Sequence, residues 1–134
     1  MQQLLYTSRA LKPFNDLELE KLLEIARFNN SQKSITGMLL YCNSNFIQLL
    51  EGPEEDLAIL FNIICKDERH VDVNKIMECN IDKPHFPEWS MGYKYLSPQQ
   101  LTQLEQNSNV DVAGFIKKTQ PYKLLKLMSG KSWN

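Results

Sequence analysis

Polar side chains within apolar segments of this sequence could form one hydrogen-bonded site. Gln48 lies in the middle of NFIQLLEG, Tyr6 and Ser8 lie in QQLLYTSRA, and Asn30 ends the segment ARFNN. A carboxamide has two donors and two acceptor positions. Leaving one of them unpaired in a protein interior costs about 1–3 kcal/mol. These groups therefore either satisfy one another and the nearby backbone, or hold a flat heterocycle whose carbonyls flank an N–H.

Alternation along two predicted strands brings these side chains together. QQLLYTSRA and NFIQLLEG are typical of strands, in which every second side chain points to the same face. Tyr6 and Ser8 then share one face, as do Phe46 and Gln48. If both faces point toward the helices, Tyr6 and Gln48 are cross-strand neighbours within hydrogen-bonding distance. Asn30 would reach the same region from the end of a helix.

The order of the predicted elements indicates an α+β fold. Helices are predicted from Asp16 to about Asn30 and from Pro53 to KDERH. Strands are predicted at QQLLYTSRA, SITGMLLYC, NFIQLLEG and VNKIMECNI, with Asn43-Ser44 as a hairpin turn. This βαββαβ order is the ferredoxin-like plan. Its first and third strands are central, and both helices lie on one face because each crossover is right-handed.

A fifth strand and a helical tail follow this unit. EWSMGYKYL is typical of a strand that places Trp89, Met91, Tyr93 and Tyr95 on one face. Residues 97–134 are predicted to hold two or three short helices. Their apolar side chains would cover the helix-free face of the sheet, or a partner surface instead. The expected domains are residues 1–96 and a C-terminal helical cap or output segment, residues 97–134.

Composition excludes several classes of protein. A net charge of -1 offers no basic stripe for nucleic acid and no polybasic membrane patch. No apolar run approaches the roughly 20 residues of a membrane span, and MQQLLYTSR lacks the pattern of a signal peptide. Cys42, Cys65 and Cys79 form an odd set without CxxC spacing, which suits reduced thiols in the cytoplasm. With His70 and His85 the only histidines, no metal site is expected.

Taken singly, each polar residue has a simpler structural explanation. Gln48 could be a hydrogen-bonded core glutamine, Tyr6 a core tyrosine, and Asn30 a helix C-cap. A ligand-free interaction module of ferredoxin-like fold is therefore the alternative function. An acylphosphatase-like enzyme is disfavoured because Arg9 and Asn43 do not lie in the Gly-rich loop that its chemistry needs.

From its start to about Tyr95 the chain resembles the BLUF domain, a flavin-binding sensor of blue light. The resemblance is carried by LLYTS, ARFNN followed by ITGMLLY, NFIQLLEG, KDERH and FPEWSM, in the family's order and at about its spacings. The tail resembles the C-terminal helices of short, stand-alone BLUF proteins. The resemblance implies a non-covalently bound flavin, FAD with FMN or riboflavin as alternatives, and a photoreceptor rather than an enzyme.

The resemblance also implies a role for each matched residue in flavin binding. Asn30 would hold the C4 carbonyl and N3 edge of the ring, with Asn29 as a second polar contact. Candidate apolar ring contacts are Ile25, Leu39 and Phe46. Candidates for the ribityl-phosphate tail, near the end of the second helix, are Asp67, Arg69 and His70. Ile63 stands where some relatives carry an arginine, for which Lys33 and Lys66 are candidate substitutes.

The photochemistry implied by the resemblance is electron and proton transfer among Tyr6, Gln48 and the flavin. Gln48 would end rotated or tautomerised, with a slight red shift of flavin absorption. Ser8, Trp89 and Met91 would form the outer part of this switch. The fifth strand and C-terminal helices would pass the change to a downstream signalling protein, with a homo-oligomer as a further expectation.

Overall fold

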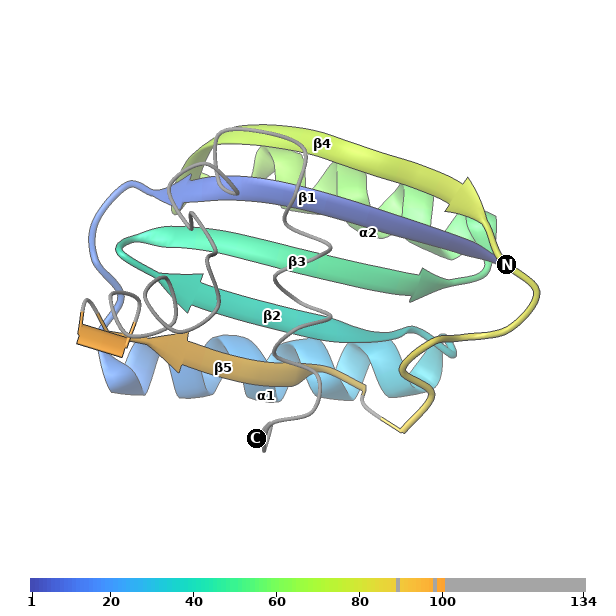
Figure 1. Ribbon diagram of the computed structural model, residues 1–134, viewed down its shortest axis with the longest axis horizontal. Helices are drawn as coiled ribbons and strands as arrows, with labels where there is room; N and C mark the ends of the chain where they lie inside the picture. The colour runs from blue at the N-terminus through green and yellow to red at the C-terminus, as the bar shows by residue number, and fades with distance from the viewer. Residues whose placement is uncertain (89, 98, 101–134) are drawn as a thin grey trace.

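The computed structural model describes residues 1–88, 90–97 and 99–100 of the chain. Within them a five-stranded sheet has the order β4-β1-β3-β2-β5. Figure 1 shows α1 behind β2 and β5, and α2 behind β1 and β4, so both helices cover the same face. The elements are β1 (Gln2–Ala10), α1 (Asp16–Gln32), β2 (Thr36–Cys42), β3 (Asn45–Gly52), α2 (Glu54–Lys66), β4 (His70–Asn80) and β5 (Gly92–Leu96).

The topology confirms the predicted ferredoxin-like plan. β1 pairs antiparallel with β3 and β4, and β2 pairs antiparallel with β3. β5 adds to the free edge of β2 in the parallel sense. In this register Gln48 lies directly opposite Tyr6 on one side and Leu39 on the other. The predicted cross-strand pairing of Tyr6 with Gln48 is therefore present.

Local sequence signals explain where α1 and the hairpin begin and end. Asn15 and Glu18 form a capping box at the start of α1, with Glu18 N donating to Asn15 Oδ1 at 2.8 Å. Asn43 and Ser44 have positive φ angles of 51° and 62°, as a tight two-residue hairpin turn requires. Gly37 allows the close approach of β2 and β3, because an added Cβ would lie 2.0 Å from the Leu49 carbonyl oxygen.

Several predicted boundaries differ from the structure. α1 continues to Gln32 with Lys33 as its C-cap, so Asn30 lies within the last turn and is not the C-cap. α2 ends at Lys66, and His70 is the first residue of β4 rather than part of a helix end. Backbone pairing with β1 extends β4 to this residue, since Ala10 lies opposite His70.

β5 is shorter than the predicted fifth strand. It begins at Gly92, so Met91 precedes the strand and was wrongly placed within it. Of the side chains predicted to share a face, Tyr93 is buried and Tyr95 is exposed. Trp89 and the predicted helices of residues 101–134 lie outside the described residues.

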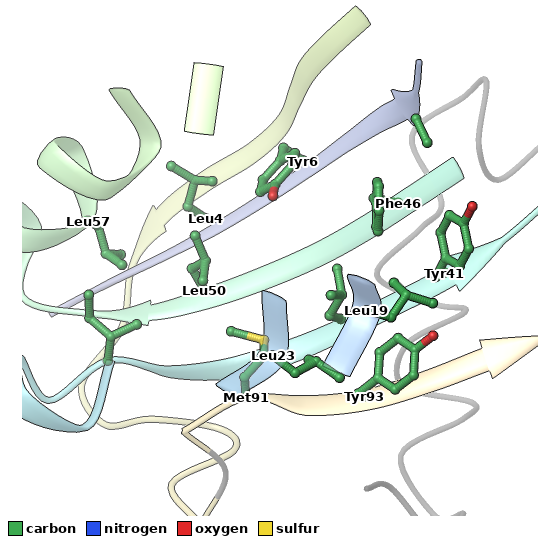
Figure 2. Packing of buried hydrophobic residues seen from close by; sticks show 13 residues of the cluster. Leu4, Tyr6, Leu19, Leu23, Tyr41, Phe46, Leu50, Leu57, Met91 and Tyr93 are labelled. Carbon is green, nitrogen blue, oxygen red and sulfur yellow. The ribbon is translucent and has the colours of Figure 1, made fainter. Parts of the chain in front are cut away.

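The two faces of the sheet are both buried. Between the sheet and the helices lies an apolar cluster that includes Tyr6, Phe46, Met91 and Tyr93, which Figure 2 shows with their neighbours. No described helix covers the opposite face of the sheet. This face carries buried side chains as well: Leu5, Met38, Leu40, Ile47 and Leu49. No helix in the described part of the chain is long and apolar enough to cross a membrane.

Candidate functional site

A cavity of about 200 Å³ opens between α1, α2 and the helix-facing side of the sheet. Every residue that the sequence predicted to contact the cofactor lines it: Tyr6, Ile25, Asn29, Asn30, Leu39, Phe46, Gln48, Asp67, Arg69 and His70. The cavity therefore brings together the whole predicted set from five elements and one connecting segment. Within the described residues, no cluster of side chains could hold a metal ion.

Tyr6 and Gln48 form a hydrogen-bonded pair at the floor of this cavity. Tyr6 Oη donates to Gln48 Oε1. The Nε2 of Gln48 lies 3.4 Å from Met91 Sδ, to which it donates. Both side chains are nearly inaccessible to solvent, with Tyr6 4% and Gln48 8% exposed. The carboxamide thus accepts at one end and donates at the other.

Burial holds Tyr6 in its neutral form. Removal from water raises the pKa of this phenol above its ordinary value, and electrostatic interactions with Cys65 and Asp67 raise it further. A neutral phenol keeps the proton that it donates to Gln48. Because only a protonated Tyr6 can donate at this position, the direction of the Tyr6–Gln48 hydrogen bond is stable at neutral pH.

Asn30 connects α1 to the segment that precedes β5. Its Nδ2 donates to the Ser90 carbonyl at 2.9 Å, and one turn earlier Arg27 Nε donates to the Met91 carbonyl at 2.9 Å. The Asn30 side chain is buried and lines the cavity. This bond uses one of its N–H groups, which leaves the carbonyl oxygen and the second N–H for another partner.

Charged and polar side chains lie at the end of the cavity near the C-terminus of α2. Arg69 pairs with Asp67 through Nη2 and Oδ2 at 2.5 Å, and this hydrogen bonding holds the pKa of Asp67 below its usual range. The Arg69 guanidinium also lies 6.0 Å from the centre of the Phe14 ring. Lys33 and Lys66 do not line the cavity, whereas Ile63 does.

His70 links this end of the cavity to β1. Its Nε2 lies 2.6 Å from the Ile64 carbonyl, which can only accept, so Nε2 carries a proton. Its Nδ1 lies 2.8 Å from Ser8 Oγ. The Ser8 hydroxyl is therefore bonded to His70, on the side away from Met91.

Sequence reasoning missed some of the residues that form the site. Phe14, in the connection between β1 and α1, lines the cavity, and no periodic pattern marks it. Arg27 contacts the backbone of Met91, and its spacing of three residues from Asn30 places both on one face of α1. That spacing was the available signal. The other missed lining residues lie on α1 and α2: Leu22, Leu23, Ala26, Leu60 and Ile64.

The cavity fits a flat heterocycle with a polar edge. Its walls are mainly apolar, and the carboxamides of Gln48 on β3 and Asn30 on α1 both line it. Each carboxamide retains an N–H beyond its hydrogen bond to the described residues. Carboxamide donors and acceptors in an apolar slot suit a ring whose carbonyls flank an N–H.

Comparison with known proteins agrees with this geometry. The sequence profile of the family described as "BLUF: Sensors of blue-light using FAD" matches residues 1–92, more than half of the chain. The chain belongs to the BLUF family. BLUF domains sense blue light through a flavin, so the match confirms the predicted family, fold, light-sensing function and FAD cofactor. No finding favours a ligand-free interaction module.

Curated relatives contain the BLUF domain within longer chains. The photoactivated adenylate cyclase subunit beta of Euglena longa is 39% identical over 89 residues, which are 66% of this chain and 10% of that protein. The blue light- and temperature-regulated antirepressor BluF of Escherichia coli (strain K12) is 40% identical over 60 residues, 45% of this chain and 15% of that one. The chain thus matches about a tenth of the cyclase subunit, and the similarity falls on its sensor domain.

Solved BLUF structures share the fold over most of this chain. The structure of BlsA in its photo-activated state has a TM-score of 0.82 at 28% identity and covers 99% of this chain and 97% of its own. The dark-state structure of the BLUF protein BlrB has a TM-score of 0.68 at 29% identity, with coverage of 91% and 96%.

Proposed function

We propose that this chain is a blue-light receptor in which Tyr6, Gln48 and Met91 form the light-sensitive hydrogen-bond switch. The observation that carries the proposal is the oriented Gln48 carboxamide, which accepts from Tyr6 Oη and donates to Met91 Sδ at the cavity floor. Family membership supplies the light-sensing function and the flavin. The assignment of the switch to these three residues is the proposal.

The proposed flavin site uses three parts of the cavity lining. Asn30, Asn29 and Gln48 would meet the polar edge of the ring. The apolar contacts to its faces would come from Ile25, Leu39 and Phe46. The ribityl-phosphate end would lie near Asp67, Arg69 and His70. Arg69 would supply the positive charge there, because Lys33 and Lys66 do not line the cavity and Ile63 is uncharged. We propose FAD as the flavin, with FMN and riboflavin as alternatives.

A bound flavin supplies blue-light absorption and, once excited, an oxidant strong enough to take an electron from a phenol. The neutral Tyr6 holds its proton at Oη, directed at Gln48 Oε1. Gln48 can pass on or return this proton because its two ends have opposite hydrogen-bonding character. A half-turn of the carboxamide exchanges those ends.

Met91 makes that half-turn unequal in energy. A thioether sulfur accepts hydrogen bonds and has no proton to donate. In the described orientation Nε2 donates to Met91 Sδ, but after a half-turn Oε1 would face the sulfur and lose this contact. We propose that Met91 then moves, and that Ser90 and β5 move with it. Trp89, the residue predicted to exchange places with Met91, lies outside the described residues.

We propose that the signal leaves through β5 and residues 97–134 to a downstream partner protein. The output to a partner is supported by relatives named as cyclases, which join a similar domain to much longer chains. We further propose that the chain is cytoplasmic and catalyses no reaction, and that it binds neither nucleic acid nor membranes. It is also a candidate to form a homo-oligomer. The Ser8 hydroxyl bonds to His70 on β4, so we do not include Ser8 in this proposed output route.

The first experiment compares absorption spectra in darkness and after blue light for the wild type, Gln48→Leu and Gln2→Leu. Gln2→Leu is the matched control, since it makes the same chemical change on β1 at a distance from the cavity. We expect a reversible red shift in the wild type and in Gln2→Leu, and no shift in Gln48→Leu. A protein without flavin absorption, or a Gln48→Leu variant that still shifts, would contradict the proposal.

A further inference from the structure

A fully buried carboxylate lies on the face of the sheet opposite the cavity. Glu51 is 0% exposed and follows Gln48 by three residues in β3, so its side chain points away from α1 and α2. Its oxygens accept from the backbone N–H groups of His85 and Phe86, both at 2.8 Å, and from Gln3 Nε2 at 3.1 Å. We refer to these four residues as the Glu51 network.

Three donors explain how a carboxylate can be buried at this position. Hydrogen bonds to an ionised acceptor are about twice as strong as those between neutral groups. Without its donors an enclosed carboxylate would be strongly unfavourable. The proposed photochemistry uses none of these contacts, and no residue of the Glu51 network lines the cavity. The network therefore has a role other than flavin binding.

The backbone that Glu51 binds leads directly to Met91. His85 and Phe86 begin a segment, residues 85–91, in which the described residues (85–88 and 90–91) form no strand or helix. Its other end is bound from the opposite side of the sheet, where Asn30 and Arg27 of α1 donate to the Ser90 and Met91 carbonyls. The segment is thus attached at both ends.

We propose that Glu51 is a positioning residue that keeps Met91 in place against Gln48. It does so by attaching the start of segment 85–91 to β3, the same strand that carries Gln48. The two partners of the switch, Gln48 and the Met91 thioether, are then held relative to one another by one rigid element. The inference rests on the proposed role of Gln48 and Met91 and adds the group that aligns them.

Glu51→Gln is the variant that tests this role. It keeps the size of the side chain, but one end of the new carboxamide is a donor and meets an N–H that needs an acceptor. Ile47→Val is the matched control, since it removes one methyl from the same strand and face and leaves the Glu51 network intact. Glu51→Asp is the second variant, which keeps the charge and shortens its reach, for use if Glu51→Gln does not fold.

The measurement uses the full flavin-bound chain labelled with [methyl-13C]methionine. The Met91 methyl signal, assigned with Met91→Leu, reports the position of Met91 in the dark. We expect Glu51→Gln to shift this signal and to speed dark recovery about fivefold, the effect of one hydrogen bond on a barrier. Ile47→Val should leave both at the wild-type values, and Glu51→Asp should change both in the same direction as Glu51→Gln.

Two results would overturn the inference. One is a Met91 signal that stays at its wild-type position in Glu51→Gln. The other is a dark recovery that is unchanged or slower in Glu51→Gln. A recovery equally fast in Ile47→Val would count against the inference too, because a purely structural role for Glu51 predicts the same effect on recovery in both variants. A wild-type protein without a red shift would instead contradict the proposed function, and the dark Met91 signal would still test the position of Met91.

Discussion

The orientation of the Gln48 carboxamide follows from its two partners. Tyr6 is buried and neutral, so its phenol presents a proton to Oε1. Met91 presents a sulfur that can only accept, so Nε2 faces it. Both partners therefore favour the same orientation of the carboxamide. A switch that depends on exchanging the two ends of a carboxamide needs such a preference in the dark.

The raised pKa of Tyr6 predicts how the protein responds to alkali. The folded phenol ionises only above its ordinary pKa of about 10, so we expect a constant red shift from about pH 6 to about pH 9. In the unfolded chain Tyr6 ionises at about pH 10. The free energy of unfolding should therefore be independent of this group below about pH 10 and fall as the pH rises further.

Spectra across this range and thermal unfolding at alkaline pH check both expectations. Tyr93 contributes to the same loss, because burial raises its pKa to about 12. Tyr6→Phe should lessen the alkaline loss of stability, because phenylalanine has no group to ionise. A red shift that titrates near neutral pH would contradict a neutral, buried Tyr6.

At the scale of elements, the pairing of β1 with β3 determines which side chains meet. Residues two apart on a strand share a face, so a slip of one residue would turn Tyr6 away from Gln48 and from the cavity. α1 contributes differently, since Arg27 and Asn30 on one of its faces bind the backbone just before β5. The switch is thus assembled from β1, β3 and a segment that α1 and β3 hold.

Met91→Ala tests whether the segment before β5 transmits the light signal. Alanine removes the sulfur acceptor, while Tyr6 and Gln48 keep their hydrogen bond. We expect the red shift to remain largely intact and the light-dependent change in residues 97–134 to be weakened. Hydrogen exchange of those residues in darkness and under blue light measures the change.

Met77→Ala is the matched control for this prediction. Met77 lies on β4, outside the cavity, and the variant should respond to light as the wild type does. A Met91→Ala variant whose tail responds like the wild type would show that the signal leaves by another route.

At the scale of the whole molecule, the two faces of the sheet carry different features. The helix-facing side carries the cavity, and the opposite side carries buried leucine, isoleucine and methionine side chains together with Glu51. No helix in the described part of the chain covers this opposite side. We propose that residues 101–134, which are rich in leucine and lie outside the described residues, cover it.

Truncation after Gln100 tests this proposal. It would expose Leu40, Ile47 and Leu49, and fully burying each such side chain is worth about 1.5–3 kcal/mol. We expect lower thermal stability and stronger binding of a hydrophobic dye, with flavin still bound on the other face. Adding residues 101–134 as a separate peptide should reverse both effects. A truncated chain as stable as the full one would contradict the proposal.

Local patterns predicted most of the fold, and together with the family resemblance they predicted many of the residues that line the cavity. The period of two in β1 and β3 placed Tyr6 and Gln48 on one face, and the βαββαβ order placed both helices over that face. Short segments such as ARFNN and NFIQLLEG carried the family resemblance. The physical reason is that alternation, capping and crossover handedness act over a few residues or one element.

Only the tertiary structure decided how the polar groups pair. Ser8 was expected in the outer part of the switch, and only the structure shows that its hydroxyl bonds to His70 on β4. Glu51 showed no pattern in the sequence, because its two backbone donors lie 34 and 35 residues further along the chain, in a segment without periodicity. The sequence alone therefore predicted the polar residues and several of the apolar residues that line the cavity, but not Phe14. The contacts between distant, irregular segments, which have no local signature, determined how those residues are held.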